Sequence, residues 1–171
     1  MQEVVILFCC FFALRLISLG ISLRNEKRIK AFGGVQYGRV NSILLTLAHI
    51  AFYFLCLFEA IHNDNLSLDS TSKWGIVLLV FAYVMLFYVI YQLREVWTLK
   101  IYILPEHKMN KSFLFKWIKH PNYFLNILPE LIGMALLCKA SLTFYVLFPI
   151  YLVILAVRIR QEENAMKHLY K

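Results

Sequence analysis

The feature that most constrains this chain is an apolar stretch from Trp74 to Tyr91 that contains no charged residue. It holds one Gly and no Pro, so nothing in it interrupts a helix. Two further runs are similar: Val4–Leu23 carries a single charge, Arg15, and Ile43–Ile61 is broken only by three polar residues. A helix of about 20 apolar residues crosses the roughly 30 Å hydrocarbon core of a bilayer. The chain is therefore predicted to cross a membrane more than once.

Composition agrees with this prediction. Hydrophobic residues make up 61% of the 171 residues and charged residues 16%, against about 45–50% and about 25% in soluble domains. The length suits one domain. We predict that residues 1–171 form a single all-α domain, an integral membrane bundle of about five transmembrane helices. The predicted spans are 4–23, 43–61, 74–93, 122–138 and 141–158.

The last two spans are predicted to form a helical hairpin that turns at Cys138–Ser141 and continues as a cytoplasmic C-terminal helix. The span 122–138 is short and contains Pro129 and Glu130, so whether it crosses completely stays open at this point. No basic segment precedes Val4–Leu23, so we expect it to be a retained helix and not a cleaved signal peptide.

The distribution of charge predicts an orientation. Basic residues gather in the connections 24–40 and 92–122 and in the C-terminal tail, whereas 62–73 carries two aspartates and one lysine. Since basic loops stay cytoplasmic, the N terminus is predicted outside and the C terminus inside, in the plasma membrane if the source is bacterial. The net charge of +8 lies beside the spans, so we expect contact with membrane lipids and no nucleic-acid partner.

The four cysteines, at positions 9, 10, 56 and 138, all lie inside apolar runs and lack the paired spacing of metal ligands. We therefore expect buried structural thiols and no metal site.

The first candidate for chemistry is the segment Lys119-His120-Pro121-Asn122-Tyr123. Pro121 suits the first position of a helix, and the free backbone amides of such a helix start attract anions. Two helical turns deeper, Glu130 is a carboxylate in an apolar helix and needs a partner. A simpler interpretation is a capped helix start, with Glu130 hydrogen-bonded inside the bundle.

The second candidate is the segment Arg158-Ile159-Arg160-Gln161-Glu162-Glu163. On a helix, Arg158 with Glu162 and Arg160 with Glu163 form two interleaved ion pairs, which by themselves indicate only a helix leaving the membrane. The hairpin, however, returns this cluster to the same membrane face as His120. Cations, carboxylates and aromatic rings would then converge there, an arrangement that suits a small zwitterionic ligand.

These segments together resemble the isoprenylcysteine carboxyl methyltransferase family, in particular its short bacterial members. The matching residues cover most of the chain: Leu23-Arg24-Asn25-Glu26-Lys27, Gly33-Gly34, Trp97-Thr98, Ile103-Leu104-Pro105, Lys119 to Tyr123, Glu130 and Arg158 to Glu163. The order and spacing of the His-Pro-x-Tyr element and the late Arg/Glu cluster are the most specific part of this pattern.

The resemblance implies a five-helix membrane bundle that binds S-adenosylmethionine near its cytoplasmic end. It also implies a lipophilic or lipidated methyl acceptor that arrives from the bilayer. Carried over by position, the implied cofactor-binding residues are Lys119, His120, Pro121, Tyr123, Glu130 and Glu162. Arg158 and Glu163 are the implied catalytic residues, and Arg160 is assigned to the substrate. Many family members carry Arg where this chain has Lys119. A lysine cannot bind a carboxylate through two parallel N–H groups, as an arginine does.

Two acceptors fit this pattern equally. The carboxylate of an isoprenylcysteine-like lipid is already ionised at neutral pH, because a terminal carboxyl has a pKa of about 3.3–3.7. A hydroxyl on a long-chain lipid such as an alkylpyrone would need a general base, for which Glu163 is the candidate. A non-catalytic membrane scaffold or lipid-binding protein, and a membrane reductase, are the interpretations from other classes.

Three polar residues inside the first two spans are interpreted structurally. Arg15 and His49 are expected to pair with other side chains inside the bundle and to take no part in catalysis. Glu59 lies near the outer end of its span and is expected to be solvated.

Overall fold

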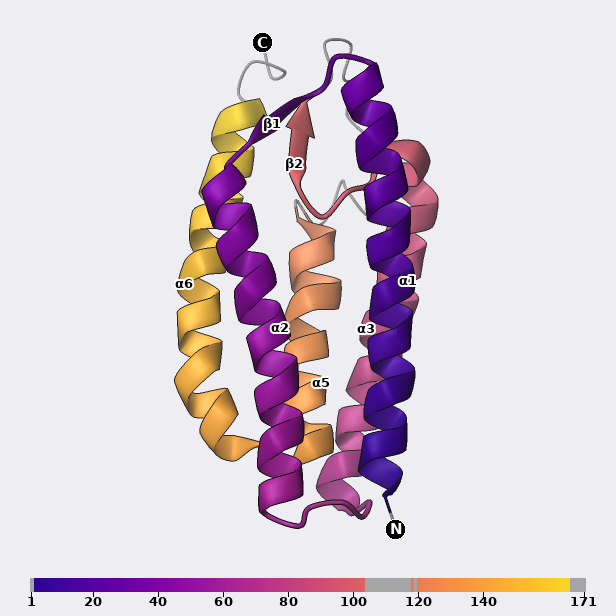
Figure 1. The fold of residues 1–171 in the computed structure, drawn as a ribbon, viewed down its shortest axis with the longest axis vertical. Helices are drawn as coiled ribbons and strands as arrows, with labels where there is room; N and C mark the ends of the chain where they lie inside the picture. The colour runs from indigo at the N-terminus through magenta and orange to yellow at the C-terminus, as the bar shows by residue number, and fades with distance from the viewer. Residues whose placement is uncertain (1, 104–117, 119, 167–171) are drawn as a thin grey trace.

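The structure is a computed structural model, and it describes residues 2–103, 118 and 120–166. It is an elongated bundle of helices (Figure 1). The helices are α1 (Glu3–Ala31), α2 (Arg39–His62), α3 (Ser70–Leu93), α5 (Leu128–Cys138) and α6 (Ser141–Met166). Shorter elements are β1 (Val35–Tyr37), the 3-10 turn η1 (Arg94–Val96), β2 (Ile101–Ile103) and the π-helix η2 (Asn122–Ile127).

Within the described residues, four helical segments are long and apolar enough to cross a membrane: Glu3–Ala31, Arg39–His62, Ser70–Val96 and Ser141–Met166. Large apolar side chains stay exposed on their outer faces, among them Val40, Trp74 and Tyr145. Such faces suit contact with lipid, because lipid tails are as apolar as the core. The prediction of an all-helical membrane bundle is confirmed in this form.

The remaining apolar helix, Asn122–Cys138, is shorter. It consists of the six-residue η2 followed by the 11-residue α5, which together extend roughly 25 Å at about 1.5 Å per residue. Among the apolar helices of the described residues, it alone is shorter than the roughly 30 Å hydrocarbon core.

The chain reverses direction after α1 through two glycines with positive φ, Gly33 and Gly38. Between them β1 pairs antiparallel with β2, so that Gln36 lies opposite Tyr102. This small sheet joins the tops of α1 and α2 (Figure 1) and was not expected from the sequence. Residues 104–117 and 119, which come after β2 in the sequence, lie outside the described residues.

The two last helices are joined by a tight turn at Lys139, which has a left-handed backbone. The turn lies where the sequence placed it, but the two helices have different main neighbours. Among the described elements, α5 packs most extensively against α3, and α6 against α2.

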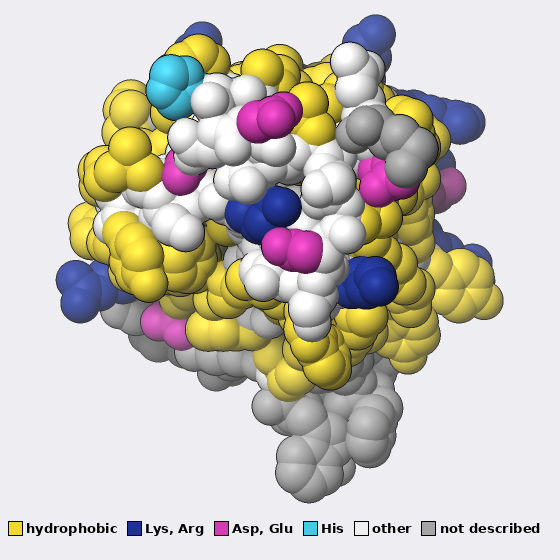
Figure 2. All heavy atoms as spheres, turned by 90° about the horizontal axis from the view of Figure 1, so that it is seen from below, with side chains coloured by type: hydrophobic (Ala, Val, Ile, Leu, Met, Phe, Trp, Pro, Cys, Tyr) yellow, Lys and Arg dark blue, Asp and Glu magenta, His cyan; other side chains and the backbone are white. Residues whose placement is uncertain are grey.

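The end of the bundle that carries the N terminus shows both signs of charge around its centre, ringed by apolar side chains (Figure 2). There the Asp69 side chain caps α3 by accepting from Ser72 N at 2.8 Å. Glu59 accepts from the backbone N–H groups of Leu142 and Thr143 at 2.9 and 2.8 Å. The expectation that Glu59 is merely solvated was therefore wrong, because the start of α6 places unpaired amides beside it.

The expectation that all four thiols are buried was also only half correct. Cys56 and Cys138 are buried, whereas Cys9 and Cys10 are exposed on α1. An apolar run does not distinguish these two situations, since both the core and lipid accept a thiol.

Candidate functional site

Arg158 is the centre of a polar cluster near the C-terminal end of α6. Its side chain is buried, with 2% of the residue exposed. Nη1 donates to Ser42 Oγ at 2.5 Å, Nη2 to the Leu99 carbonyl at 2.8 Å, and Nε to Tyr123 Oη at 3.2 Å. The guanidinium therefore ties α6 to α2, to η2 and to the segment before β2.

Tyr123 extends this cluster toward the two late glutamates. Its hydroxyl donates to Glu162 Oε2 at 2.6 Å while it accepts from Arg158. The ring of His120 stacks on that of Tyr123, with centroids 5.6 Å apart and planes at 20°. His120 Nδ1 lies 3.6 Å from Glu162 Oε2, and Nε2 lies 3.4 Å from Glu163 Oε1.

The charge of His120 follows from these neighbours. Burial works against the protonated ring, but hydrogen bonds and charges from Glu162 and then Glu163 outweigh it, so the pKa of His120 is raised above 6.5. The imidazole is therefore held in its cationic form to a higher pH than a free histidine. Arg158, His120, Glu162 and Glu163 together carry two positive and two negative charges when His120 is protonated.

The local backbone brings His120 and Tyr123 together. Pro121 has helical backbone angles and is buried, and the π-helix η2 begins directly after it. The His120 carbonyl accepts from both Tyr123 N and Phe124 N, at 3.1 and 3.2 Å. The predicted helix start is confirmed, although its wide π geometry was not foreseen.

A cavity of about 470 Å³ lies beside this cluster, within the size range of small-molecule sites. His120, Tyr123, Arg158 and Glu162 contribute to its lining. Its other polar lining residues include Arg15, Ser42, His49, Tyr53, Trp97 and Tyr151, and its apolar wall includes Phe12, Leu16, Leu19, Leu45, Ile50 and Phe54. A polar end and an apolar wall from α1 and α2 suit an amphiphilic ligand.

A second polar cluster surrounds the fully buried carboxylate of Glu130. Glu130 Oε1 accepts from Tyr53 at 2.5 Å and from Tyr83 at 3.1 Å, and lies 3.4 Å from His49 Nε2. Glu130 Oε2 lies 3.2 Å from Arg15 Nη1. Side chains from α1, α2 and α3 thus converge on one carboxylate of α5.

The expectation that Arg15 and His49 pair within the bundle is confirmed. Arg15 is ion-paired with Glu130, and His49 Nδ1 also lies 3.2 Å from the Tyr151 hydroxyl of α6. Both residues line the cavity as well, so the second cluster faces the same space as the first.

Five of the predicted site residues come together around one point: His120, Tyr123, Arg158, Glu162 and Glu163. Pro121 starts the helix beside them. Glu130 is the centre of the second cluster and is not among the residues that line the cavity. Arg160 is exposed and does not line the cavity either. Lys119 lies outside the described residues.

Three tyrosines of the second cluster were not foreseen from the sequence: Tyr53, Tyr83 and Tyr151. Neither were Ser42, which contacts Arg158, and Trp97 in the cavity wall. Each lies in or beside an apolar run. A tyrosine in such a run can face either lipid headgroups or the core, so its position in the sequence does not identify its partners. The one available signal was the unpaired carboxylate of Glu130, because a buried charge requires donors from neighbouring helices.

Among the described residues no group of three or more His, Cys, Asp or Glu side chains is arranged to hold a metal ion. The fold and this geometry define a class: an integral membrane protein whose helices enclose a polar, partly apolar-walled cavity toward one end. The chain belongs to the isoprenylcysteine carboxyl methyltransferase (ICMT) family, whose sequence model matches residues 75–168. Family membership makes it, in general terms, a membrane methyltransferase.

Two relatives extend the similarity over nearly the whole chain. An uncharacterized protein of Haemophilus influenzae is 60% identical over 165 residues, covering 96% of this chain and 95% of that protein. The uncharacterized protein YpbQ of Bacillus subtilis is 27% identical over 155 residues, covering 90% of each chain. No solved structure matches.

Proposed function

We propose that this protein is an S-adenosylmethionine-dependent O-methyltransferase that methylates the carboxylate of a lipid-bearing, isoprenylcysteine-like acceptor. The observation that carries the proposal is the chain of contacts Arg158–Tyr123–Glu162–His120 on the wall of the cavity. It lies within the part of the chain that matches the ICMT family.

The cavity residues fit a zwitterionic cofactor. The carboxylate of Glu162 and the guanidinium of Arg158 both line the cavity. The buried Nε1 of Trp97, also a lining residue, has no hydrogen-bond partner among the described residues. In the proposal, the methyl donor S-adenosylmethionine is bound by five residues: Lys119, His120, Pro121, Tyr123 and Glu162. Glu130 acts through Arg15 and His49, which its carboxylate holds at the cavity wall. When bound, S-adenosylmethionine supplies an electrophilic methyl group on its sulfonium.

Arg158 is the proposed clamp for the acceptor carboxylate. A guanidinium has five N–H donors, and three contacts of Arg158 within the described residues use one nitrogen each. Donors therefore remain for an acceptor oxygen, and their direction is fixed by Ser42, Leu99 and Tyr123. Holding two reactants in line contributes roughly 7–11 kcal/mol to such a transfer. The exposed Arg160 is proposed to meet the acceptor outside the cavity.

A carboxylate acceptor requires no general base, because it is ionised at neutral pH. The contact between His120 and Glu163 at 3.4 Å favours, as a second candidate, the hydroxyl of a long-chain lipid such as an alkylpyrone. In that reaction Glu163, as a carboxylate, would take the hydroxyl proton.

The test begins with calorimetric titration of the detergent-purified protein with S-adenosylmethionine. We expect saturable binding that is lost in Tyr123→Phe/His120→Ala, because the ring stack and its carboxylate contacts are removed together. Transfer of a labelled methyl group to prenylcysteine analogues and to alkylpyrones then identifies the acceptor.

The variant Arg158→Lys tests the proposed binding of the acceptor. It keeps the positive charge but loses the planar guanidinium that binds a carboxylate through two N–H groups. We expect methyl transfer to fall by roughly a hundredfold or more, while cofactor binding is kept. Arg24→Gln, which removes an exposed cation of α1, is the control. If the folded wild-type protein binds no S-adenosylmethionine, the proposal is contradicted.

A further inference from the structure

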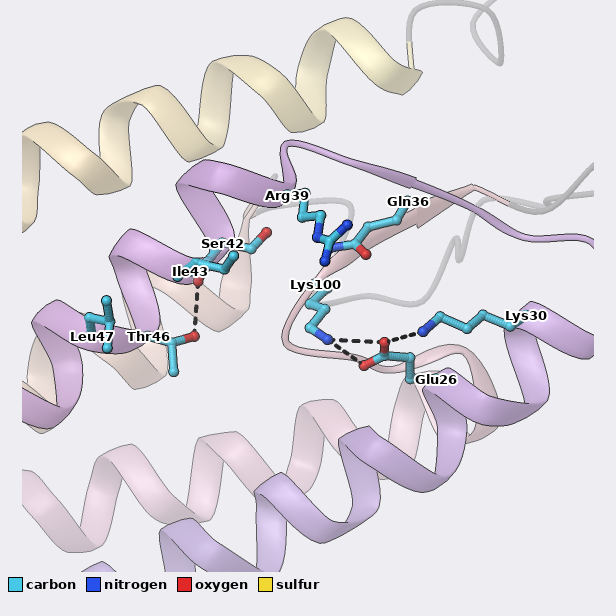
Figure 3. A pocket seen from close by; sticks show the side chains of 9 residues that line it. All are labelled: Glu26, Lys30, Gln36, Arg39, Ser42, Ile43, Thr46, Leu47 and Lys100. Carbon is cyan, nitrogen blue, oxygen red and sulfur yellow. Dashed lines mark hydrogen bonds and ion pairs between the residues drawn. The ribbon is translucent and has the colours of Figure 1, made fainter.

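A second cavity, of about 480 Å³, opens where α1 ends and α2 begins (Figure 3). We call it the basic vestibule. It is lined by Glu26, Lys30, Gln36, Arg39, Ser42, Ile43, Thr46, Leu47 and Lys100. Of these, only Lys100 lies within the part of the chain that matches the ICMT family, and the proposed methyl transfer uses none of the charged ones.

The vestibule carries more positive than negative charge. Its single carboxylate, Glu26, lies 2.7 Å from Lys30 Nζ and accepts from Lys100 Nζ at 3.0 and 2.8 Å. Tyr102 donates to the same carboxylate at 2.7 Å. Arg39 has no ion-pair partner among the described residues, and Figure 3 shows its side chain beside Gln36, across the opening from Lys30. The vestibule thus holds three cations and one carboxylate, and only Lys30 and Lys100 contact that carboxylate.

One wall of the vestibule is apolar. Ile43 and Leu47 are four residues apart on α2, so they lie on the same face of the helix, and they are 49% and 58% exposed. Lys30 lies in the last turn of α1 and Arg39 begins α2. The ends of membrane helices are at the level of lipid headgroups. A charged rim above an apolar wall matches an anionic head on a hydrocarbon chain.

The vestibule adjoins the cavity of the proposed active site. Ser42, Thr46 and Lys100 line both spaces, and Ser42 Oγ accepts from Arg158. A molecule with its charged head among the lysines can therefore reach the Arg158 cluster with another part of the same molecule.

We propose that the basic vestibule binds the anionic head, a phosphate or carboxylate, of a single-chain amphiphile. If the proposed methyl transfer is correct, the methyl acceptor is then an anionic lipid with a second negative group apart from the atom that is methylated. Arg39 and Lys100 bind the head, and Glu26 competes with it for Lys30 and Lys100.

The test measures binding of dodecyl phosphate to the full-length protein in phosphatidylcholine nanodiscs, without S-adenosylmethionine. Arg39→Gln should weaken binding about tenfold, as expected for one charge-assisted contact. Glu26→Gln should strengthen it severalfold, because both lysines lose their internal anion. Lys27→Gln removes an exposed cation of α1 that does not line the vestibule, and it should leave the affinity unchanged.

The opposite signs expected for Glu26→Gln and Arg39→Gln separate this proposal from a general loss of folding. Equal weakening by Lys27→Gln and Arg39→Gln would overturn it, since the attraction would then be that of the whole basic surface. Equal binding of dodecanol would also overturn it, because the chain alone would suffice.

Two further binding measurements identify the source of the anion. If inorganic phosphate binds as tightly as dodecyl phosphate, the vestibule binds a free anion, and the proposal that its ligand is an amphiphile is wrong. If phosphatidylglycerol in the nanodisc blocks dodecyl phosphate in wild type and not in Arg39→Gln, a bilayer lipid occupies the site and the acceptor assignment is wrong. Titration with S-adenosylmethionine in the same nanodiscs tests the proposed methyl transfer separately from the vestibule.

Discussion

At the scale of single residues, this bundle depends on two charged side chains that are removed from water. Glu130 is 0% and Arg158 2% exposed. Charged groups at membrane depth are costly unless they are paired, and each of these two is held by partners from at least three separate segments. Both contact networks join the polar interior of the bundle to the cavity, so stability and the proposed function share the same residues.

The first prediction concerns the ion pair of Glu130 with Arg15. Glu130→Gln leaves the Arg15 charge without its partner at 3.2 Å, and we expect the free energy of unfolding to fall by roughly 3–5 kcal/mol. Arg15→Met/Glu130→Gln, which removes both charges, should recover much of the loss. Unfolding in mixed micelles measures both. A single variant as stable as wild type would contradict the assignment of this pair.

At the scale of elements, α3 and α5 pack more extensively than any other pair among the described elements. A Cβ added at Gly75 would meet the Gly133 carbonyl at 2.7 Å, and one at Gly133 would meet Leu79 Cγ at 2.9 Å. Small residues let membrane helices approach closely. This approach positions α5, and with it Glu130 and η2, which carries Tyr123.

The second prediction follows from this contact. Gly75→Ala should destabilise the bundle by roughly 1–3 kcal/mol, because the new methyl group would overlap the backbone of α5. Gly20→Ala is the matched control, since nothing lies within 4 Å of its added Cβ. That variant should be neutral or up to about 1 kcal/mol more stable, as Ala favours a helix. Thermal unfolding in detergent compares the two, and equal effects would contradict the packing argument.

At the scale of the whole molecule, the two ends differ. The end with the vestibule carries an excess of cations. At the other end, the start of α1 and the connection from α2 to α3 carry Glu3, Asp64 and Asp69, and Figure 2 shows charges of both signs there. The orientation predicted from the loops places the vestibule and the Arg158 cluster at the cytoplasmic face. A cofactor made in the cytoplasm would then meet its site directly.

The third prediction tests that orientation. In a background with Cys9 and Cys10 replaced by Ala, an impermeant maleimide added to intact cells should label Ser67→Cys and leave Lys27→Cys unlabelled until the membrane is opened. Both positions are exposed in the structure, so access depends on the side of the membrane. The reverse labelling pattern would place the site outside.

The sequence by itself determined the long apolar helices and the turn at Lys139. It also named five residues that meet at the Arg158 cluster, although not Ser42. These depend on local properties: hydropathy over about 20 residues, turn chemistry, and the order of side chains along a helix. Five site residues at positions 120 to 163 could be named before the structure was known because they lie close to helix starts and ends.

Only the tertiary structure decided which faces of these helices meet. Because lipid and protein core are both apolar, the pattern of apolar residues does not mark the buried face of a membrane helix. The partners of Glu130, the packing of α6 on α2 and the two adjoining cavities all depend on helix rotation. That rotation is set by close contacts such as Gly75 with Gly133 and by the need of each buried charge for a partner on another helix.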